Sequence, residues 1–181
     1  TPYIFLQNIY MKCITFDVDI ANVNNNEEES NIRCSSGFNY VCDISNAYEY
    51  TDDEQFDMIN HLYNITDFEN RLSLVKDIKT KITSYGQQDK LKNIFSPDDF
   101  ITFKEVIDLL HKAKMRCYYC KNNVKVIYKY KRMPYQWTLD RIDNEKGHIK
   151  NNVVISCLHC NLKRRCLNSD KYLFTKTLKV V

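Results

Sequence analysis

The amino-acid sequence predicts an α+β protein. A mainly helical region is expected over residues 1–111, followed by a small, cysteine-rich module with strands and a helix over residues 112–181. Three observations support this division: apolar residues recur at helical spacing between residues 52 and 110, cysteines form two close pairs after residue 116, and the charge changes sign near residue 100. With 44% hydrophobic residues, the chain can bury a core and is predicted to be globular.

Three helices are expected in the first region. The first covers residues 52–65, where the apolar positions share one face. The second follows Asp67, which can cap it, and is expected to end at Gly86. The third follows the capping residue Ser96, with Pro97 at its first helical position. We expect the apolar faces of all three helices to pack in the core.

Strands are expected on both sides of these helices. Residues 3–20 favour one or two strands, and the polar residues 22–31 favour an exposed loop. In the second region β-favouring residues predict strands at 124–130, 136–142 and 153–156. A helix is then expected from Leu158 onward.

The charges are unevenly distributed. Residues 1–100 contain 17 acidic and 8 basic residues, whereas residues 101–181 contain 6 acidic and 18 basic residues. A basic half beside an acidic half favours binding of a polyanion by the basic half. The alternative is that the opposite charges only attract the two halves to each other.

The cysteine spacing predicts a metal site. The sequence contains two Cys-x-x-Cys motifs, a spacing typical of zinc sites. One pairs Cys117 with Cys120, the other pairs Cys157 with Cys160, and 36 residues separate them. Four thiolates complete a tetrahedron and leave no open position, so one structural zinc is expected. A disulfide framework and a redox Cys-x-x-Cys are the alternatives. The other cysteines are expected to be free thiols: Cys13, Cys34, Cys42 and Cys166.

The cellular location is predicted from two features that the sequence lacks, a membrane-spanning segment and a signal peptide. No apolar run approaches the roughly 20 residues that a membrane-spanning helix needs, so no membrane association is expected. The first residues do not resemble a signal peptide, which favours an intracellular, reducing compartment such as the cytoplasm, the nucleus or a site of viral replication. An organelle stays open, because a chain that begins without Met could be a processed fragment.

The segment between the two cysteine pairs resembles a known family. It reads Trp-Thr-Leu-Asp-Arg-Ile from Trp137, then a Gly turn, Asn-Val, the second cysteine pair and Asn-Leu-Lys-Arg from Asn161. This pattern is similar to that of the HNH (ββα-metal) endonucleases, in particular the branch with a four-cysteine zinc site. The resemblance covers about residues 115–168 and implies a small ββα-metal module that hydrolyses phosphodiester bonds in DNA.

The resemblance also implies roles for individual residues. Asp140 and Asn161 correspond to the ligands of a catalytic Mg²⁺ or Mn²⁺ ion, and Asn152 to the residue that braces the loop between the strands. Arg141 stands where the family has its general-base His, and Arg cannot act as a base. The nearest His in the motif is His148, which is a candidate for a displaced base; a solvated loop residue is the alternative.

Basic residues flank the motif and are candidates for phosphate contacts. Such contacts provide affinity that does not depend on sequence. The candidates lie in the loop before the motif and at its end: Lys129, Lys131, Arg132, Lys163, Arg164 and Arg165.

Three hypotheses follow for the function. The first is a metal-dependent endonuclease acting on DNA. The second is a catalytically degenerate relative that keeps the zinc fold and binds nucleic acid, or serves as a structural component of a larger assembly; the missing base His favours it. The third is a zinc-bearing scaffold whose acidic N-terminal region binds a protein partner.

Overall fold

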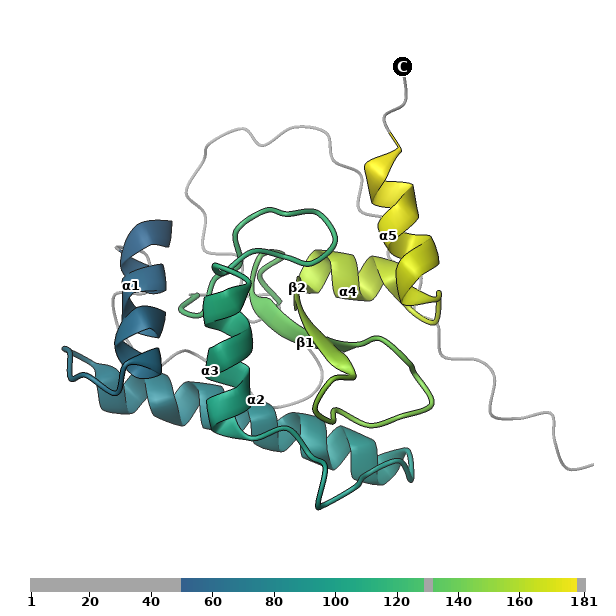
Figure 1. The fold of residues 1–181 in the computed structure, drawn as a ribbon, viewed down its shortest axis with the longest axis horizontal. Coiled ribbons are helices and arrows are strands. Elements are labelled where there is room, and N and C mark those ends of the chain that lie inside the picture. Colours follow the sequence, from purple (N-terminus) through teal and green to yellow (C-terminus); the bar gives the residue numbers. More distant parts are fainter. Residues whose placement is uncertain (1–49, 129–131, 179–181) are drawn as a thin grey trace, which may run out of the picture. The chain divides into compact units, whose positions relative to one another are not determined.

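The computed structural model describes residues 50–128 and 132–178. The strands and loop expected within residues 3–31, the cysteines at positions 13, 34 and 42, and Lys129 and Lys131 lie outside the described residues. All described residues belong to one compact unit. Along the chain the elements are α1 (Asp52–Tyr63), α2 (Arg71–Leu91), α3 (Phe103–Lys112), β1 (Trp137–Arg141), β2 (Val153–Cys157), α4 (Leu158–Arg164) and α5 (Ser169–Thr177) (Figure 1).

The mixture of helices with a small sheet confirms the predicted combination of secondary structure. α1 begins at Asp52 within the predicted range, because Thr51 and Glu54 form a capping box in which each side chain binds the other residue's backbone N–H. In Figure 1, α1 and α3 stand side by side and α2 runs across their ends, consistent with the contacts that α3 makes with both helices.

α2 is longer than predicted and starts later. The expected end at Gly86 is wrong, because the helix continues to Leu91. Gly86 is instead buried, and a Cβ added to it would lie 3.2 Å from Cζ of Phe100, so the position serves close packing. The expected cap is also wrong: Asp67 accepts the N–H of Phe68, and Asn70 precedes the helix with a φ of 63°.

α3 also begins later than predicted. The predicted start at Ser96 and Pro97 is a turn, in which the Ser96 hydroxyl donates to Asp99 at 2.8 Å. The helix starts after Thr102, whose capping box with Glu105 satisfies the first N–H groups. The helix starts at the capping box rather than at Ser96-Pro97 because the capping box satisfies two backbone N–H groups at once.

β1 and β2 form an antiparallel two-stranded sheet, and α4 follows β2 directly. Both strands and this helix lie where the sequence predicts them. The strand expected from residue 124 does not form within residues 124–128. Two of its N–H groups bind a side chain instead: those of Val126 and Ile127 both donate to Oε1 of Gln55 on α1, at 3.0 Å.

The open edge of β1 is covered by a polar stripe on α2. Lys81 donates from Nζ to the carbonyl of Trp137, and the N–H of Leu139 donates to the Tyr85 hydroxyl at 3.1 Å. One turn further, Asp89 accepts the N–H of His148 in the loop between the strands. Lys81, Tyr85 and Asp89 are spaced four residues apart and so lie on one face of α2. This face supplies hydrogen bonds that a third strand would otherwise make.

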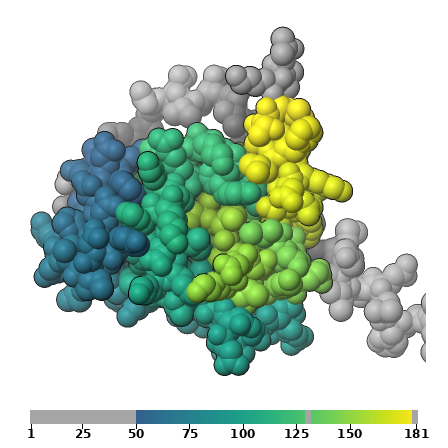
Figure 2. Space-filling model, in the orientation of Figure 1, coloured from purple at the N-terminus to yellow at the C-terminus, as the bar shows by residue number. Residues whose placement is uncertain are grey.

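The helices and the sheet share a single hydrophobic core. It contains residues of α1, α2 and α3 together with both strands and the cysteine-rich turns. Figure 2 shows the N-terminal helices (blue and teal) packed directly against the green residues that follow them in the chain. Among the described residues, no helix combines the length and apolar content needed to cross a bilayer.

We predict that Gln55→Leu lowers the free energy of unfolding by about 1–3 kcal/mol for each of the two N–H groups it leaves without a partner. Gln55 is almost fully buried, so water cannot replace its oxygen. Urea denaturation measures the effect. Gln87→Leu makes the same change on the exposed surface of α2 and serves as the control. Equal stabilities of the two variants would contradict the role of Gln55.

Candidate metal centre

Four cysteine side chains meet at the junction of the sheet and α4. Cys117 and Cys120 lie in the turn after α3, Cys157 ends β2, and Cys160 lies in the first turn of α4. The four sulfur atoms all lie within 4.8 Å of one another, and those of Cys120 and Cys157 are 3.8 Å apart. The two predicted Cys-x-x-Cys pairs therefore form one cluster, which could hold a metal ion.

The spacing of the sulfur atoms fits tetrahedral zinc. A Zn–S bond of about 2.3 Å places the sulfur atoms of a regular tetrahedron roughly 3.8 Å apart. A disulfide would require about 2.05 Å, and the four cysteines are free thiols. With all four ligand positions filled by sulfur, such an ion has no open position for a substrate, and its role is structural.

The thiols of the cluster strongly affect one another's pKa values. Hydrogen bonds from Cys157 and Cys160 lower the pKa of the Cys117 thiol well below its usual range. The same contacts with Cys117 raise the pKa of Cys157 far above its usual range and that of Cys160 to about 12. Without a metal ion, the Cys117 thiolate is thus stabilised by its neighbours, which keep their protons; binding of a divalent metal would require those protons to be released.

Backbone hydrogen bonds hold the first cysteine turn against the sheet. The N–H of Tyr118 donates to the carbonyl of Ile155 on β2 at 2.8 Å, and the N–H of Lys121 donates to the carbonyl of Cys117 at 3.0 Å. On the other side, the N–H of Cys160 donates to the sulfur of Cys157 at 3.4 Å. Such N–H···S contacts stabilise a thiolate at the start of a helix.

Asp140 is linked to the first cysteine turn through Tyr119, and both of its carboxylate oxygens have hydrogen-bond partners. The Tyr119 hydroxyl donates to Oδ2 at 2.6 Å, and Nη1 of Arg164 lies 2.8 Å from Oδ1. Asp140 is 5% exposed, and burial raises the pKa of its carboxyl group against the opposing effects of Tyr119 and Arg164. Each carboxylate oxygen already has a partner, and the nearest positive charge belongs to Arg164.

Asn161 approaches the same strand from α4. Its amide nitrogen donates to the hydroxyl of Thr138 at 3.1 Å, and that hydroxyl lies 2.8 Å from Oγ of Ser156. Thr138 and Asp140 are two positions apart on β1, so their side chains lie on one face of the sheet. The two residues expected to ligate a catalytic cation, Asp140 and Asn161, therefore both lie at the contact between β1 and α4.

Asn152 holds the loop between β1 and β2. Its amide nitrogen donates to the carbonyls of Asp143 and Gly147, both at 3.0 Å, and its oxygen accepts the N–H of Asp143 at 2.9 Å. Arg141 acts on the same loop, donating to the carbonyls of Asn144 and Lys146. Both side chains thus bind loop backbone.

His148 is buried and paired with α2. It is 5% exposed, its Nδ1 lies 2.8 Å from Oδ1 of Asp89, and its ring packs against Tyr85 at an angle of 36°, with the ring centres 4.5 Å apart. Burial lowers its pKa, with Asp89 acting in the opposite direction. The solvated position considered from the sequence is wrong. Within the described part of the chain no hydrogen bond joins His148 to Asp140, and the contacts of His148 with Asp89 attach the loop to α2.

The predicted phosphate-binding residues divide into two groups. The prediction that Arg164 contacts phosphate is wrong. This side chain is 1% exposed, and its guanidinium binds Asp140 and the carbonyl of Ile142 in the interior. Arg132, Lys163 and Arg165 are exposed and can contact a ligand.

Sequence reasoning missed Tyr119 and Asp89, the partners of Asp140 and His148. Tyr119 lies between two metal-ligand candidates and resembles a core aromatic, and Asp89 resembles any exposed helical acid. Neither residue carries a sequence signal, since their roles arise from contacts over 21 and 59 residues.

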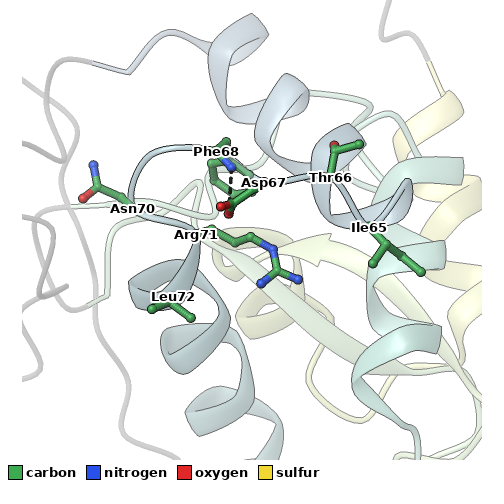
Figure 3. Close-up of a pocket in the computed structure, with 7 residues that line it drawn as sticks. All are labelled: Ile65, Thr66, Asp67, Phe68, Asn70, Arg71 and Leu72. Carbon is green, nitrogen blue, oxygen red and sulfur yellow. Dashed lines mark hydrogen bonds between the residues drawn. The ribbon is translucent and has the colours of Figure 1, made fainter.

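A separate hollow of about 540 Å³ lies at the turn between α1 and α2, within residues 65–72 (Figure 3). Ile65 and Leu72 at its border are largely exposed. No cysteine and none of the predicted site residues line it, so it is not part of the metal centre.

Comparisons of the chain with protein-family models, curated proteins and solved structures find no match. The function is therefore inferred from the residues and their geometry.

We predict that Cys157→Ser abolishes tight zinc binding and unfolds the C-terminal third of the chain. Structural zinc contributes about 10–16 kcal/mol in small zinc-binding peptides, comparable to the whole stability of a domain, about 5–15 kcal/mol. Elemental analysis and circular dichroism measure the two effects. Cys166→Ser changes an exposed thiol outside the cluster and should retain one zinc per chain. Zinc retained by Cys157→Ser, or absent from the native protein, would disprove the assignment.

Proposed function

We propose that the chain is a metal-dependent endonuclease of the HNH type that hydrolyses phosphodiester bonds in DNA. The observation that carries the proposal is that Asp140 on β1 and Asn161 on α4 both lie at the interface between these two elements, and that two of the four clustered cysteines lie at the start of α4. The order strand, strand, helix agrees with the arrangement that the sequence resemblance implies.

Asp140 and Asn161 would hold a Mg²⁺ or Mn²⁺ ion, for which their oxygen atoms are suitable ligands. Such an ion supplies charge stabilisation to the scissile phosphate and the leaving oxygen. The fit has one condition. Arg164 now balances the charge of Asp140, so its guanidinium must release Oδ1 before the carboxylate can serve a divalent cation.

Neither candidate base within residues 50–128 and 132–178 is suited to activate water beside Asp140. Arg141 remains protonated, and His148 is buried against Asp89. Absence of a positioned base typically reduces the rate by about 10²–10⁴-fold, which slows hydrolysis without abolishing it. The proposed activity is therefore weak and dependent on the ion.

A second candidate is a nucleic-acid-binding module without catalysis. The observation that favours it is the ion pair between Asp140 and Arg164, both of which are buried. Removal of one partner of such a pair usually costs about 3–5 kcal/mol, because the other charge is left buried and unpaired. In this candidate the pair is a permanent structural link between β1 and α4.

We predict that the full-length chain nicks supercoiled plasmid with Mg²⁺ or Mn²⁺, and that Asp140→Asn and Asn161→Ala lower the rate at least tenfold. Asp140→Asn keeps the side-chain volume and a polar group for Tyr119, and bound zinc and circular dichroism verify folding. Glu145→Gln removes an exposed carboxylate from the neighbouring loop and should cleave at the wild-type rate.

If folded wild-type protein cleaves no faster than Asp140→Asn with either ion, on duplex, branched or single-stranded DNA, the endonuclease proposal fails. Retained DNA binding in the same preparation would then support the second candidate.

We predict that the chain binds duplex DNA with an affinity that falls linearly in a plot of log affinity against log salt. Each phosphate contact contributes a slope of about 0.9. The double variant Lys163→Ala, Arg165→Ala should reduce the slope by up to this amount per residue. Lys90→Ala, Lys92→Ala removes two exposed cations near the end of α2 and serves as the control. Fluorescence anisotropy measures the slopes, and an affinity independent of salt would contradict the prediction.

A further inference from the structure

Arg164 and Asp140 form a buried ion pair whose hydrogen bonding is incomplete. Arg164 is 1% exposed and Asp140 is 5% exposed, and Nη1 of Arg164 lies 2.8 Å from Oδ1 of Asp140. Nη2 donates to the carbonyl of Ile142 at 3.0 Å, whereas Nε is buried without a hydrogen-bond partner in the described part of the chain. A buried ion pair offsets the cost of desolvation only when its remaining donors are satisfied. The guanidinium is therefore held less firmly than its burial suggests.

The contact with the carboxylate is also one-sided. Arg164 binds only Oδ1 of Asp140, because Oδ2 accepts the Tyr119 hydroxyl at 2.6 Å. The pair thus lacks the two parallel bonds that make arginine–carboxylate pairs strong. Release of Arg164 breaks a single bond to Asp140 and leaves the bond from Tyr119 in place.

The charges at this pair set the condition for that release. The carboxylate and the guanidinium neutralise each other, so a divalent cation that joins them adds two uncompensated positive charges to a buried site. A DNA phosphate that arrives with the cation supplies a negative charge, and the planar guanidinium is well suited to bind it. Without the phosphate, Asp140 is the only anion that the structure offers to Arg164 within the described residues.

We infer that Arg164 is an internal counter-ion that excludes a divalent cation from Asp140 until a DNA phosphate binds. The cation and DNA then favour each other's binding, by a factor that is typically about 5–150 between linked sites. The inference rests on the proposed endonuclease function and adds a regulation of the same site: the chain acquires its catalytic cation together with its substrate.

Arg164→Gln tests the inference with Mn²⁺, whose binding to the zinc-loaded full chain is measured from the EPR signal of the free ion. The variant removes the positive charge and keeps an amide donor. Without DNA we expect it to bind Mn²⁺ about tenfold or more tightly than the wild type, because the removed charge lies a hydrogen-bond length from the carboxylate. Duplex DNA should tighten Mn²⁺ binding by the wild type, and have a smaller effect on the variant.

Two further variants serve as controls. Arg165→Gln makes the same change at the next residue, whose side chain is exposed, and should bind Mn²⁺ as the wild type does. Addition of Asp140→Asn to Arg164→Gln should abolish the gain in affinity, which assigns the ion to this carboxylate. Equal Mn²⁺ affinities of Arg164→Gln and the wild type would overturn the inference, even where the wild type nicks DNA. If the endonuclease proposal itself fails, neither protein nicks DNA or binds Mn²⁺ at Asp140 with DNA present, and the inference fails with it.

Thermal unfolding covers the case in which loss of Arg164 destabilises the fold. Removal of one partner leaves Asp140 buried and unpaired, so Arg164→Gln should have a lower Tm than the wild type. A ligand that binds only the folded state stabilises it, so Mn²⁺ should raise the Tm of the variant and change that of the wild type little. If the pair is only a structural link, the lowered Tm will not respond to Mn²⁺, and the inference is wrong.

The wild-type protein provides a test that needs no substitution. In ¹⁵N-arginine-labelled protein, the buried Nε–H of Arg164 should give a signal protected from exchange with water. Mg²⁺ alone should leave this signal unchanged, whereas Mg²⁺ with duplex DNA should shift it as the guanidinium leaves Asp140. An unshifted signal at concentrations of Mg²⁺ and DNA that support nicking contradicts the release of Arg164.

Discussion

The convergence of four thiols from two distant segments constrains the C-terminal half of this structure. Cys117 and Cys120 fix the turn after α3, while Cys157 and Cys160 fix the junction of β2 with α4. Because Tyr119 lies inside the first turn, fixing that turn also fixes the hydroxyl that binds Asp140. Metal binding and the position of the proposed catalytic carboxylate are thus linked through a single side chain.

Buried carboxylates impose a second constraint. Asp140 and Asp89 are both enclosed, and each has a partner from a different element: Arg164 on α4 for the first, His148 in the loop for the second. A desolvated carboxylate is stable only with such a partner, so each pair fixes one element against another. The strands carry few residues of their own, and these polar links compensate for a small sheet.

The sequence predicts the parts of the fold that depend on local signals. Helical spacing locates α1, the β-favouring residues locate β1 and β2, and the two Cys-x-x-Cys pairs locate the cluster. The failures have one physical origin, which is competition from partners distant in sequence. Gln55 accepts the N–H groups of Val126 and Ile127 in the segment where a strand was expected, and Phe100 packs against Gly86 within α2. Arg164 resembles a surface cation until Asp140 is placed beside it.

The polar stripe of α2 has a consequence for the modularity of the chain. Lys81 and Tyr85 bind the backbone of β1 along the edge that β2 leaves open. If residues 112–178 were transplanted into another scaffold, this edge would be left bare, and bare strand edges recruit other chains into aggregates. The cysteine-rich segment is therefore not a portable unit, although its motif occupies a contiguous stretch of sequence. Its natural boundary for engineering lies before α1, because Gln55 on that helix also binds the N–H groups of Val126 and Ile127.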